Sequence, residues 1–262
     1  MPEGHTLHRI ARDHNRWFLN QRLQVRSPQG RFEIEAETLN KKTLRNVEAY
    51  GKHLVYEFSS NQVLHVHLGL YGKFRTFRMP APEPRGAVRV RMLGADRGFD
   101  LNGPNTCELL TREGLGKLVG RIGPDPLRKD ADPEIVWSKI RKSRAAIGSL
   151  LLNQSVIAGL GNIYRAEILF IHCIHPDRPG NLITPAEFEM IWDTSVRLLK
   201  LGVRYNKIIT VERPKCGKPL SKLNSLERVQ IYKQPNCPRC GADVVCWELA
   251  NRTMYACEHC QV

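Results

Sequence analysis

The sequence predicts an α+β protein built from several parts, and three observations support this class. Short strand-like runs dominate the first 125 residues, apolar residues at helical spacing fill the middle of the chain, and paired cysteines occupy its C-terminal end. Short alternating or continuous apolar runs indicate strands, whereas spacings of three and four residues indicate helices. We therefore place the predicted domains at residues 1–125, 126–225 and 226–262.

Four segments support the β interpretation of the first part, and one segment departs from it. Residues 53–58 and 63–68 are rich in strand-forming side chains, and the polar residues 59–62 between them are typical of a turn, so together they predict a hairpin. Residues 88–93 begin with an apolar and polar alternation that predicts a half-buried strand. Residues 6–19 keep apolar side chains on one face, as a helix does.

Helix start signals recur after the sequence Gly-Pro-Asp-Pro at residues 123–126. Asp132 can cap a helix whose first residue is Pro133, because an aspartate oxygen accepts from an N–H of the first turn and proline lacks only a donor that is unused there. Residues 145–152 and 160–170 predict two further helices. The middle of the chain is therefore predicted to be helical.

The longest predicted helix begins at Thr184, which is followed by Pro185 and, three positions after the threonine, by Glu187. This pattern is a capping box, in which the threonine and glutamate side chains satisfy backbone N–H groups reciprocally. Gly202 is the expected end of this helix, since glycine readily adopts the left-handed conformation that terminates helices.

The charge of the chain predicts a polyanionic partner. Forty Lys and Arg residues against 26 Asp and Glu residues give a net charge of +14, which is typical of nucleic-acid-binding proteins. No apolar run approaches the roughly 18 residues that a membrane span needs, so we expect no membrane association. The N-terminus lacks a basic segment followed by an apolar run, so a cytoplasmic location is expected rather than secretion.

Two Cys-x-x-Cys pairs near the C-terminus predict a metal site. Cys237 and Cys240 form the first pair, and Cys257 and Cys260 form the second. Four thiolates suit tetrahedral zinc and leave no open position, so one structural Zn²⁺ ion is expected. The segment between the two pairs predicts a hairpin over residues 244–256. The alternative is a pair of redox motifs. Ordinary buried or half-buried thiols are expected at the other cysteines, which are Cys107, Cys173, Cys216 and Cys246.

The dipeptide Pro2-Glu3 predicts an N-terminal nucleophile. Removal of Met1 would leave a proline with a free α-amino group, and α-amines titrate near about 7.7–8.0, well below lysine. A neutral secondary amine can attack an aldehydic carbon and form an iminium. Glu3 is placed to exchange the protons that such a reaction moves. The alternative is a frayed terminus without a role.

Taken together, four motifs in order make the chain resemble the formamidopyrimidine-DNA glycosylase/endonuclease VIII family of DNA repair enzymes. They are the N-terminal motif at residues 1–4, the lysine hairpin motif at 51–54, the segment 154–164 and the two cysteine pairs. The resemblance spans the whole chain. It implies an N-terminal β-sandwich, a helical helix-two-turn-helix domain and a C-terminal zinc-finger β-hairpin.

The resemblance also implies the chemistry. Pro2 would attack C1′ of the damaged nucleotide, Glu3 would act as the acid and base, and Lys52 would contact phosphate and assist proton transfer. The implied function is a bifunctional DNA glycosylase and AP lyase of base excision repair, which removes oxidised pyrimidines from duplex DNA and cuts the strand by β,δ-elimination. The implied partner is damaged double-stranded DNA, bound by a monomer near the nucleoid without a nucleotide cofactor.

Four further residues match positions that the family uses to bind DNA. Asn162 and Arg252 would hold phosphates beside the lesion, with a capping asparagine and a solvated turn residue as the alternatives. Leu70 and Tyr71 resemble the wedge that fills the gap left by the extruded nucleotide, and the alternative is a core pair at the end of a strand.

Two departures from the family pattern concern the substrate. Thr6 stands where relatives carry a second glutamate, and Gly69 stands where the bacterial endonuclease VIII has a glutamine before the wedge. Both changes leave base specificity open. The alternatives are a lyase that acts mainly on abasic sites, a glycosylase for oxidised purines, and a non-catalytic zinc protein that binds DNA.

Overall fold

The computed structural model describes residues 2–212 and 217–262, which form two compact units. The first unit contains residues 2–3 and 7–121, and the second contains residues 4–6 and 122–262. The first turn of helix α1 (Gly4–Phe18) thus belongs to the second unit, and the rest of that helix belongs to the first. In the described part of the chain, no helix combines the length and the apolar character needed to cross a membrane.

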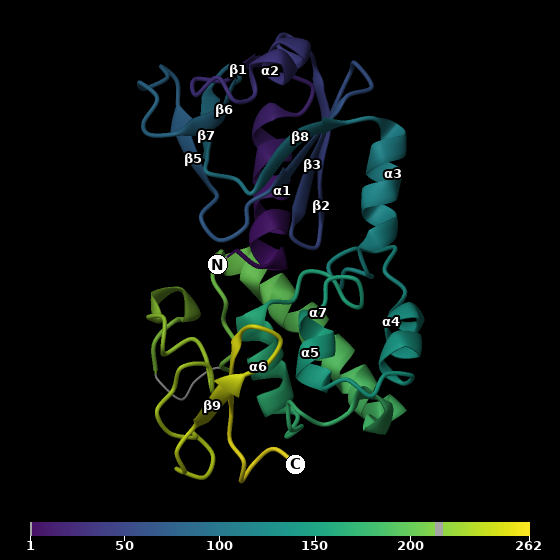
Figure 1. The fold of residues 1–262 in the computed structure, drawn as a ribbon. Coiled ribbons are helices and arrows are strands. Elements are labelled where there is room, and N and C mark those ends of the chain that lie inside the picture. The colour runs from purple at the N-terminus through teal and green to yellow at the C-terminus, as the bar shows by residue number, and fades with distance from the viewer. Residues whose placement is uncertain (1, 213–216) are drawn as a thin grey trace. The chain divides into compact units, whose positions relative to one another are not determined.

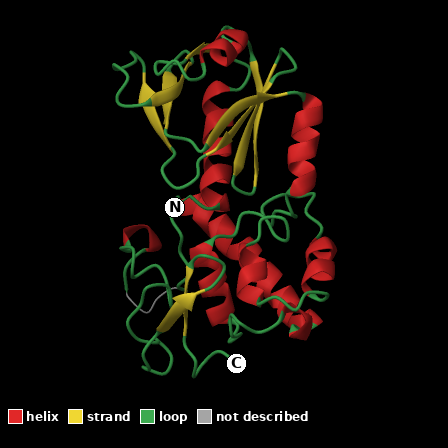
Figure 2. Ribbon diagram, viewed as in Figure 1, coloured by secondary structure: helices red, strands yellow, loops and turns green. Residues whose placement is uncertain are grey.

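The first unit is built around two antiparallel four-stranded sheets, with strand orders β2-β3-β4-β8 and β1-β6-β7-β5 (Figures 1 and 2). The strands are β1 (Gln24–Arg26), β2 (Leu44–Tyr50), β3 (His53–Phe58), β4 (Val63–His67), β5 (Lys73–Arg78), β6 (Val88–Leu93), β7 (Arg97–Asn102) and β8 (Thr106–Leu110). Helices α1, α2 (Glu33–Leu39) and α3 (Arg112–Arg121) complete the unit.

The core of the first unit joins α1 to both sheets. Leu7, Ala11 and Phe18 lie on the buried face of α1 and belong to one apolar cluster with strand residues such as Tyr56 and Phe99. Full burial of side chains of this size contributes roughly 1.5–3 kcal/mol each. The predicted hairpin of β3 and β4, the strand β6 and the early helix are therefore confirmed, although the helix begins at Gly4.

The second unit is helical. Its helices are α4 (Pro133–Ile140), α5 (Ile147–Leu152), α6 (Asn162–Ile171) and α7 (Pro185–Tyr205), with single 3-10 turns at η1 (Gly180–Leu182) and η2 (Leu220–Lys222). The predicted caps are confirmed, because an Asp132 oxygen accepts from the Glu134 N–H at 2.9 Å and Thr184 forms a capping box with Glu187.

The predicted end of α7 at Gly202 is wrong. The helix continues to Tyr205, and Asn206 ends it in the left-handed conformation with φ 53°. Gly202 is instead a packing residue, since a Cβ at this position would lie 2.7 Å from the Cγ of His5 and would also collide with the Tyr164 hydroxyl. A glycine inside a helix can serve close packing as well as termination, and local sequence does not distinguish the two.

A buried carboxylate anchors the segment that follows η2. Glu167 on α6 is fully buried, and its oxygens accept from the N–H groups of Gln230, Ile231 and Tyr232 at 2.7–2.9 Å and from the Thr210 hydroxyl. Burial raises the pKa of Glu167, and these hydrogen bonds oppose that shift. The carboxylate thereby fixes three consecutive backbone groups against α6.

The C-terminal hairpin pairs β9 (Val245–Glu248) with β10 (Thr253–Ala256) in antiparallel register. Its two-residue turn has left-handed backbone at Ala250 and Asn251, with φ 55° and 57°, and the Leu249 N–H donates to the Arg252 carbonyl at 3.0 Å. Positive φ at both central residues suits the right-handed twist of a tight hairpin. The hairpin predicted from the cysteine spacing is confirmed.

Candidate functional site

Pro2 and Glu3 directly precede Gly4, whose backbone is bonded to a distant loop. Glu3 is 1% exposed and precedes α1 in extended conformation, and Pro2 is half-buried. The Gly4 N–H donates to the Gly159 carbonyl at 2.8 Å, and Gly159 adopts the left-handed conformation with φ 86°. The start of the chain is therefore attached to the loop before α6 by main-chain atoms.

Close approach of the two backbones requires glycine at position 4. A Cβ on Gly4 would lie 2.7 Å from the Cα of Gly159, which is closer than real Cβ atoms come to other carbons. Sequence analysis identified both glycines as parts of motifs, but their contact joins residues that are far apart in the chain and leaves no local signal.

Replacing Gly4 by alanine is expected to displace the N-terminus and to lower the free energy of unfolding by about 1–3 kcal/mol, since the new methyl group meets backbone rather than a movable side chain. Thermal unfolding followed by circular dichroism measures the loss. Gly116→Ala is the matched control, because a Cβ there meets nothing within 4 Å. Equal melting temperatures for the two variants would show that the contact is not tight.

Lys52 lies in the two-residue turn that joins β2 and β3. Tyr50 and His53 are paired across the turn, and Gly51 adopts φ 57°. Glycine at the first central position is typical of the turns that suit hairpins. The pair Gly51-Lys52 therefore fits a tight turn that carries a half-buried lysine.

Three histidines beside Lys52 form a hydrogen-bonded and stacked cluster that sequence analysis missed. His53 and His67 are directly paired across β3 and β4 with ring centroids 4.8 Å apart, and His65 Nε2 lies 2.9 Å from His53 Nδ1. His65 Nδ1 lies 2.9 Å from a carboxylate oxygen of Glu108. The register of three strands assembles this group, and its only sequence signal is the alternation of histidines in residues 63–68.

Two of the three histidines, His53 and His67, have pKa values below the ordinary value for histidine. Burial lowers the pKa of His53, and the neighbouring histidines and the positive charges of Arg121 and Lys52 add to this shift, which brings the pKa to about 3. Burial also lowers the pKa of His67, with His65 and Lys52 adding to the shift. The rings of His53 and His67 therefore favour the neutral form, whereas Lys52 and Arg121 place positive charge near this turn.

The turn between β4 and β5 presents Leu70 and Tyr71 to solvent. Their exposed fractions are 51% and 84%, so the alternative of a core pair is wrong. Gly69 has φ 64°, and a Cβ there would lie 2.8 Å from the Cβ of Asn105. The Gly72 N–H donates to the Leu68 carbonyl at 3.0 Å. The turn thus requires glycine at position 69, where the endonuclease VIII pattern has glutamine.

Asn162 is the first residue of α6, and its amide faces inward. The side chain is 6% exposed, its Nδ2 donates to the Thr253 carbonyl at 2.8 Å, and its Oδ1 accepts from Arg165 Nε at 3.1 Å. The alternative of a capping asparagine is wrong, because Gly161 occupies the cap position. The residue instead connects the start of α6 to the hairpin strand β10.

Arg252 lies at the turn of the hairpin, where sequence analysis placed it, and it is exposed. Its Nη1 reaches only the neighbouring Asn251 carbonyl at 3.5 Å. The structure therefore brings Asn162 and Arg252 to one place in the second unit, while Pro2, Glu3, Lys52 and the pair Leu70 and Tyr71 belong to the first unit.

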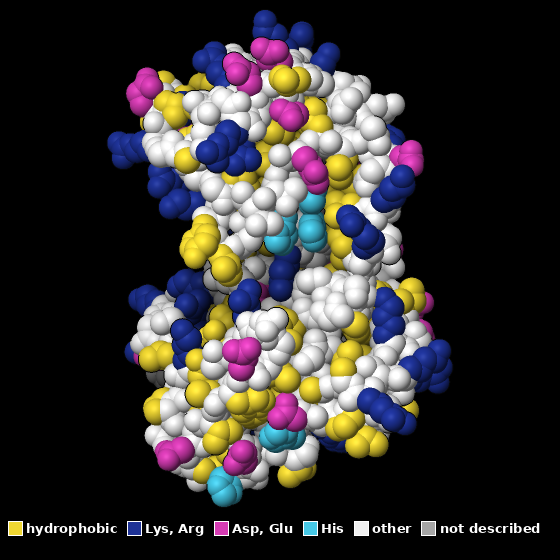
Figure 3. All heavy atoms as spheres, in the orientation of Figure 1, with side chains coloured by type: hydrophobic (Ala, Val, Ile, Leu, Met, Phe, Trp, Pro, Cys, Tyr) yellow, Lys and Arg dark blue, Asp and Glu magenta, His cyan; other side chains and the backbone are white. Residues whose placement is uncertain are grey.

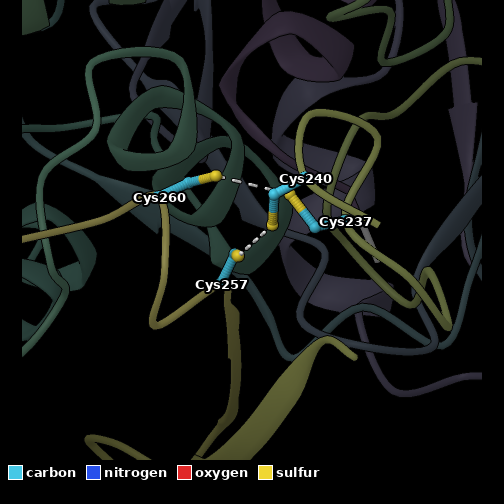
Figure 4. Close-up of side chains that lie close together, drawn as sticks. All are labelled: Cys237, Cys240, Cys257 and Cys260. Atoms are coloured by element: carbon cyan, nitrogen blue, oxygen red, sulfur yellow. Dashed lines mark hydrogen bonds between the residues drawn. The ribbon is translucent and has the colours of Figure 1, made fainter. Parts of the chain in front are cut away.

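The four paired cysteines converge at the base of the hairpin. Their sulfur atoms lie within 4.8 Å of one another, with Cys237 to Cys260 at 3.8 Å and Cys240 to Cys257 at 3.5 Å (Figure 4). Four sulfurs around one zinc ion at about 2.3 Å would be about 3.8 Å apart, so this donor set and its spacing fit a tetrahedral metal ion.

The expectation for the other cysteines is met in part. Cys107 is half-buried, as expected, but Cys173 and Cys246 are exposed. Cys173 follows the end of α6 with φ 59°, and Cys246 lies on the hairpin strand β9, paired with Tyr255. Cys216 lies outside the described residues.

A cavity of about 310 Å³ lies beside the start of α6. Its lining includes Ile163, Val229, Tyr232 and Lys233. The Glu167 carboxylate accepts from the backbone N–H groups of Ile231 and Tyr232, which fixes the backbone on that side of the cavity. Lys and Arg side chains are distributed over both units on the face shown in Figure 3.

The sequence matches two described families. Residues 1–102 match the formamidopyrimidine-DNA glycosylase N-terminal domain, and residues 122–213 match the formamidopyrimidine-DNA glycosylase H2TH domain. "Endonuclease 8 1" of Mycobacterium tuberculosis is 47% identical over 268 residues, with 100% of both chains covered. "Endonuclease 8" of Pectobacterium atrosepticum is 30% identical and covers 83% of each chain.

Solved structures agree with the sequence matches. The structure described as a complex between the Lactococcus lactis Fpg and DNA containing an abasic site has a TM-score of 0.81 with this chain, at 26% sequence identity and with 99% of each chain covered. The correspondence therefore extends over both units and the C-terminal hairpin.

Proposed function

Because the chain belongs to the formamidopyrimidine-DNA glycosylase and endonuclease VIII family of base excision repair, whose members are DNA glycosylases with AP lyase activity, we propose that it removes oxidised pyrimidines from duplex DNA and cuts the strand by β,δ-elimination. The observation that supports this most directly is the start of the chain. Pro2 and the buried Glu3 precede a helix that is fixed by the contact between Gly4 and Gly159.

Pro2 is the proposed nucleophile. Its nitrogen bonds to C1′ of the damaged nucleotide, the bond from C1′ to the base breaks, and the base leaves with a proton. Opening of the sugar gives an iminium, which makes the C2′ proton acidic enough for β-elimination of the 3′ phosphate. δ-Elimination then releases the 5′ phosphate. Glu3 donates and accepts these protons, and Lys52 contacts phosphate from its turn.

Trapping with borohydride tests this assignment. Wild-type protein incubated with abasic-site DNA and sodium borohydride should form a covalent adduct, because the reductant converts the iminium into a stable amine. Peptide mapping should place the adduct on residue 2. A non-catalytic zinc protein that only binds DNA would give no adduct, and an adduct on an internal lysine would exclude Pro2 as the nucleophile.

The second unit is proposed to hold the phosphates. The start of α6 offers backbone N–H groups of the kind that bind anions, and Arg252 extends a planar guanidinium suited to bidentate contact with phosphate. The Asn162 amide is bonded within the protein, so we propose that it fixes the hairpin against α6 and contacts phosphate only by exchanging one of these bonds.

Replacing Arg252 by alanine is expected to weaken DNA binding and to reduce the salt dependence of log K by about one unit of slope, because one fewer phosphate is neutralised. Fluorescence anisotropy with labelled abasic-site duplex over a salt series measures both. Lys117→Ala is the matched control, since this exposed lysine pairs with Glu113 on α3. Unchanged affinity at low salt would exclude Arg252 as a phosphate contact.

Leu70 and Tyr71 are the proposed wedge. Extrusion of a nucleotide costs a few kcal/mol, and an exposed aromatic ring on a rigid turn can stack on the bases left behind. The exposure of both wedge residues and the glycines that shape their turn support this assignment.

The cysteine cluster is proposed to bind one structural Zn²⁺ ion. All four coordination positions would be thiolates, so the ion would stabilise the hairpin that carries Arg252 and would leave no site for a reacting water. The enzyme would act as a monomer on nucleoid DNA without a nucleotide cofactor.

The residue at position 6 bears on lesion preference. Thr6 carries a hydroxyl, which lies 3.2 Å from His5 Nε2, and it therefore supplies no second carboxylate. A lyase that acts mainly on abasic sites is therefore the second candidate. Single-turnover rates on duplexes with an oxidised pyrimidine, an oxidised purine or an abasic site separate the candidates, since only the lyase would leave both modified bases in place.

A further inference from the structure

Arg165 is a fully buried arginine on α6 that no step of the proposed mechanism uses. Its Nε donates to Asn162 Oδ1 at 3.1 Å, and its Nη1 donates to the Gly148 carbonyl on α5 at 3.0 Å. Its Nη2 donates to the Leu249 carbonyl at 3.0 Å and reaches the Arg252 carbonyl at 3.4 Å. One guanidinium thus contacts two helices and both ends of the hairpin turn.

These contacts complete a connection between α6 and the hairpin. Asn162 donates to Thr253, which directly follows Arg252, and Arg165 holds Asn162 in the orientation for that bond. A Cβ on Gly148 would lie 2.8 Å from the Cδ2 of Leu249, so α5 also packs tightly against the turn. The backbone on both sides of Arg252 is therefore fixed while its side chain extends into solvent.

From this geometry we propose that Arg165 is a positioning residue for DNA binding: it fixes the turn that presents Arg252 against the start of α6, so that the Arg252 side chain and the backbone N–H groups of α6 meet phosphates on one rigid frame. The inference rests on the proposed function. Preorganisation of this kind increases affinity because the turn loses less conformational freedom when DNA binds. Arginine is required, since its planar fork serves several carbonyls at fixed angles and an ammonium group cannot.

The test compares Arg165→Lys, Arg252→Ala and the double variant in the full-length protein. Arg165→Lys is expected to raise KM for abasic-site duplex roughly tenfold while kcat changes much less, because the reacting amine lies in the other unit. If Arg165 acts through Arg252, the substitution Arg165→Lys should weaken DNA binding less in the Arg252→Ala background than in the wild-type protein. Fully multiplicative losses, or wild-type KM for Arg165→Lys, would overturn the proposal.

Two controls separate the possible failures. Arg178→Lys alters another guanidinium of the second unit, which bonds to Glu187 and the Leu182 carbonyl, and it should leave KM unchanged. A merely structural role for Arg165 would lower kcat as well as raise KM. It would also make the affinity losses of Arg165→Lys and Arg252→Ala multiply in the double variant. If wild type itself gives no borohydride adduct, the proposed function fails, whereas an adduct with wild-type KM for Arg165→Lys rejects only this inference.

A measurement on unaltered protein covers the case in which Arg165→Lys does not fold. The Nε–H of a buried, hydrogen-bonded arginine exchanges slowly and gives a resolved ¹⁵N resonance. Binding of a duplex with a tetrahydrofuran abasic-site analogue should shift that resonance and slow its exchange, because DNA tightens the turn that Arg165 holds. An unchanged resonance at saturating duplex would contradict the coupling.

Discussion

Replacing Pro2 by glycine is expected to slow strand cleavage at abasic sites by about 100-fold or more, which corresponds to about 2.7 kcal/mol of transition-state stabilisation. Glycine keeps an α-amine but loses the ring that makes the nucleophile secondary and restricts its rotation. The amine would therefore form a less activated imine from a less ordered position. Binding to the same duplex should change little, because no phosphate contact is proposed for this residue.

Single-turnover cleavage with excess protein measures the chemical step, and anisotropy with a tetrahydrofuran duplex measures binding. A second variant that retains one residue before Pro2 is the stricter control, because it converts the proline amine into an amide and should abolish the borohydride adduct on residue 2. Mass spectrometry must show the intended N-terminus in each preparation. Unimpaired turnover by the extended variant would end the assignment of Pro2.

Local sequence predicts those parts of the fold whose signals lie within a few residues. The capping box at Thr184, the cap at Asp132 and the cysteine spacing each specify an interaction between neighbours in the chain, and each is found in the structure. Hairpins with short turns are predicted for the same reason, because their signals also lie within a few residues of one another. The end of α7 was predicted wrongly at Gly202 because that glycine serves packing against His5.

The features that sequence analysis missed all depend on distant residues. The contact between Gly4 and Gly159, the histidine cluster across β3 and β4, and the bonds of Arg165 to the hairpin become visible only when the topology is known. From sequence alone, an arginine such as Arg165 is expected at the surface, because arginine is rarely buried. Its guanidinium can nevertheless be buried where several carbonyl groups accept its hydrogen bonds.

The roles of single residues also depend on contacts with residues that are distant in the sequence. The family resemblance assigns Asn162 to a phosphate, whereas the structure shows its amide bonded to Thr253 and Arg165. Gly69 departs from the endonuclease VIII pattern and leaves base specificity open, and the structure supplies a conformational reason for the glycine, since φ is 64° and a Cβ would lie close to Asn105. In both cases the residue type fits more than one role, and only its surroundings decide between them.

Removal of the proposed zinc ion is the second change with a large expected effect. A two-stranded hairpin of four-residue strands is marginal in water by itself, and structural zinc contributes free energy directly to folding. Treatment with a strong chelator, or Cys257→Ser, should therefore increase hydrogen exchange in residues 237–260 and weaken binding to abasic-site duplex by roughly 100-fold. The sheets of the first unit should keep their exchange protection, because they form a separate core.

Metal analysis of freshly purified protein should give one zinc per chain, and Cys246→Ser is the matched control. Cys246 is exposed on the same hairpin and lies outside the cluster of four sulfurs, so its replacement should leave both the zinc content and DNA binding unchanged. Loss of binding after chelation, with the hairpin amides still protected, would instead place the metal in direct contact with DNA. Protein that contains no metal yet binds the duplex at full affinity would show that the hairpin and Arg252 are held by packing and by Arg165 alone.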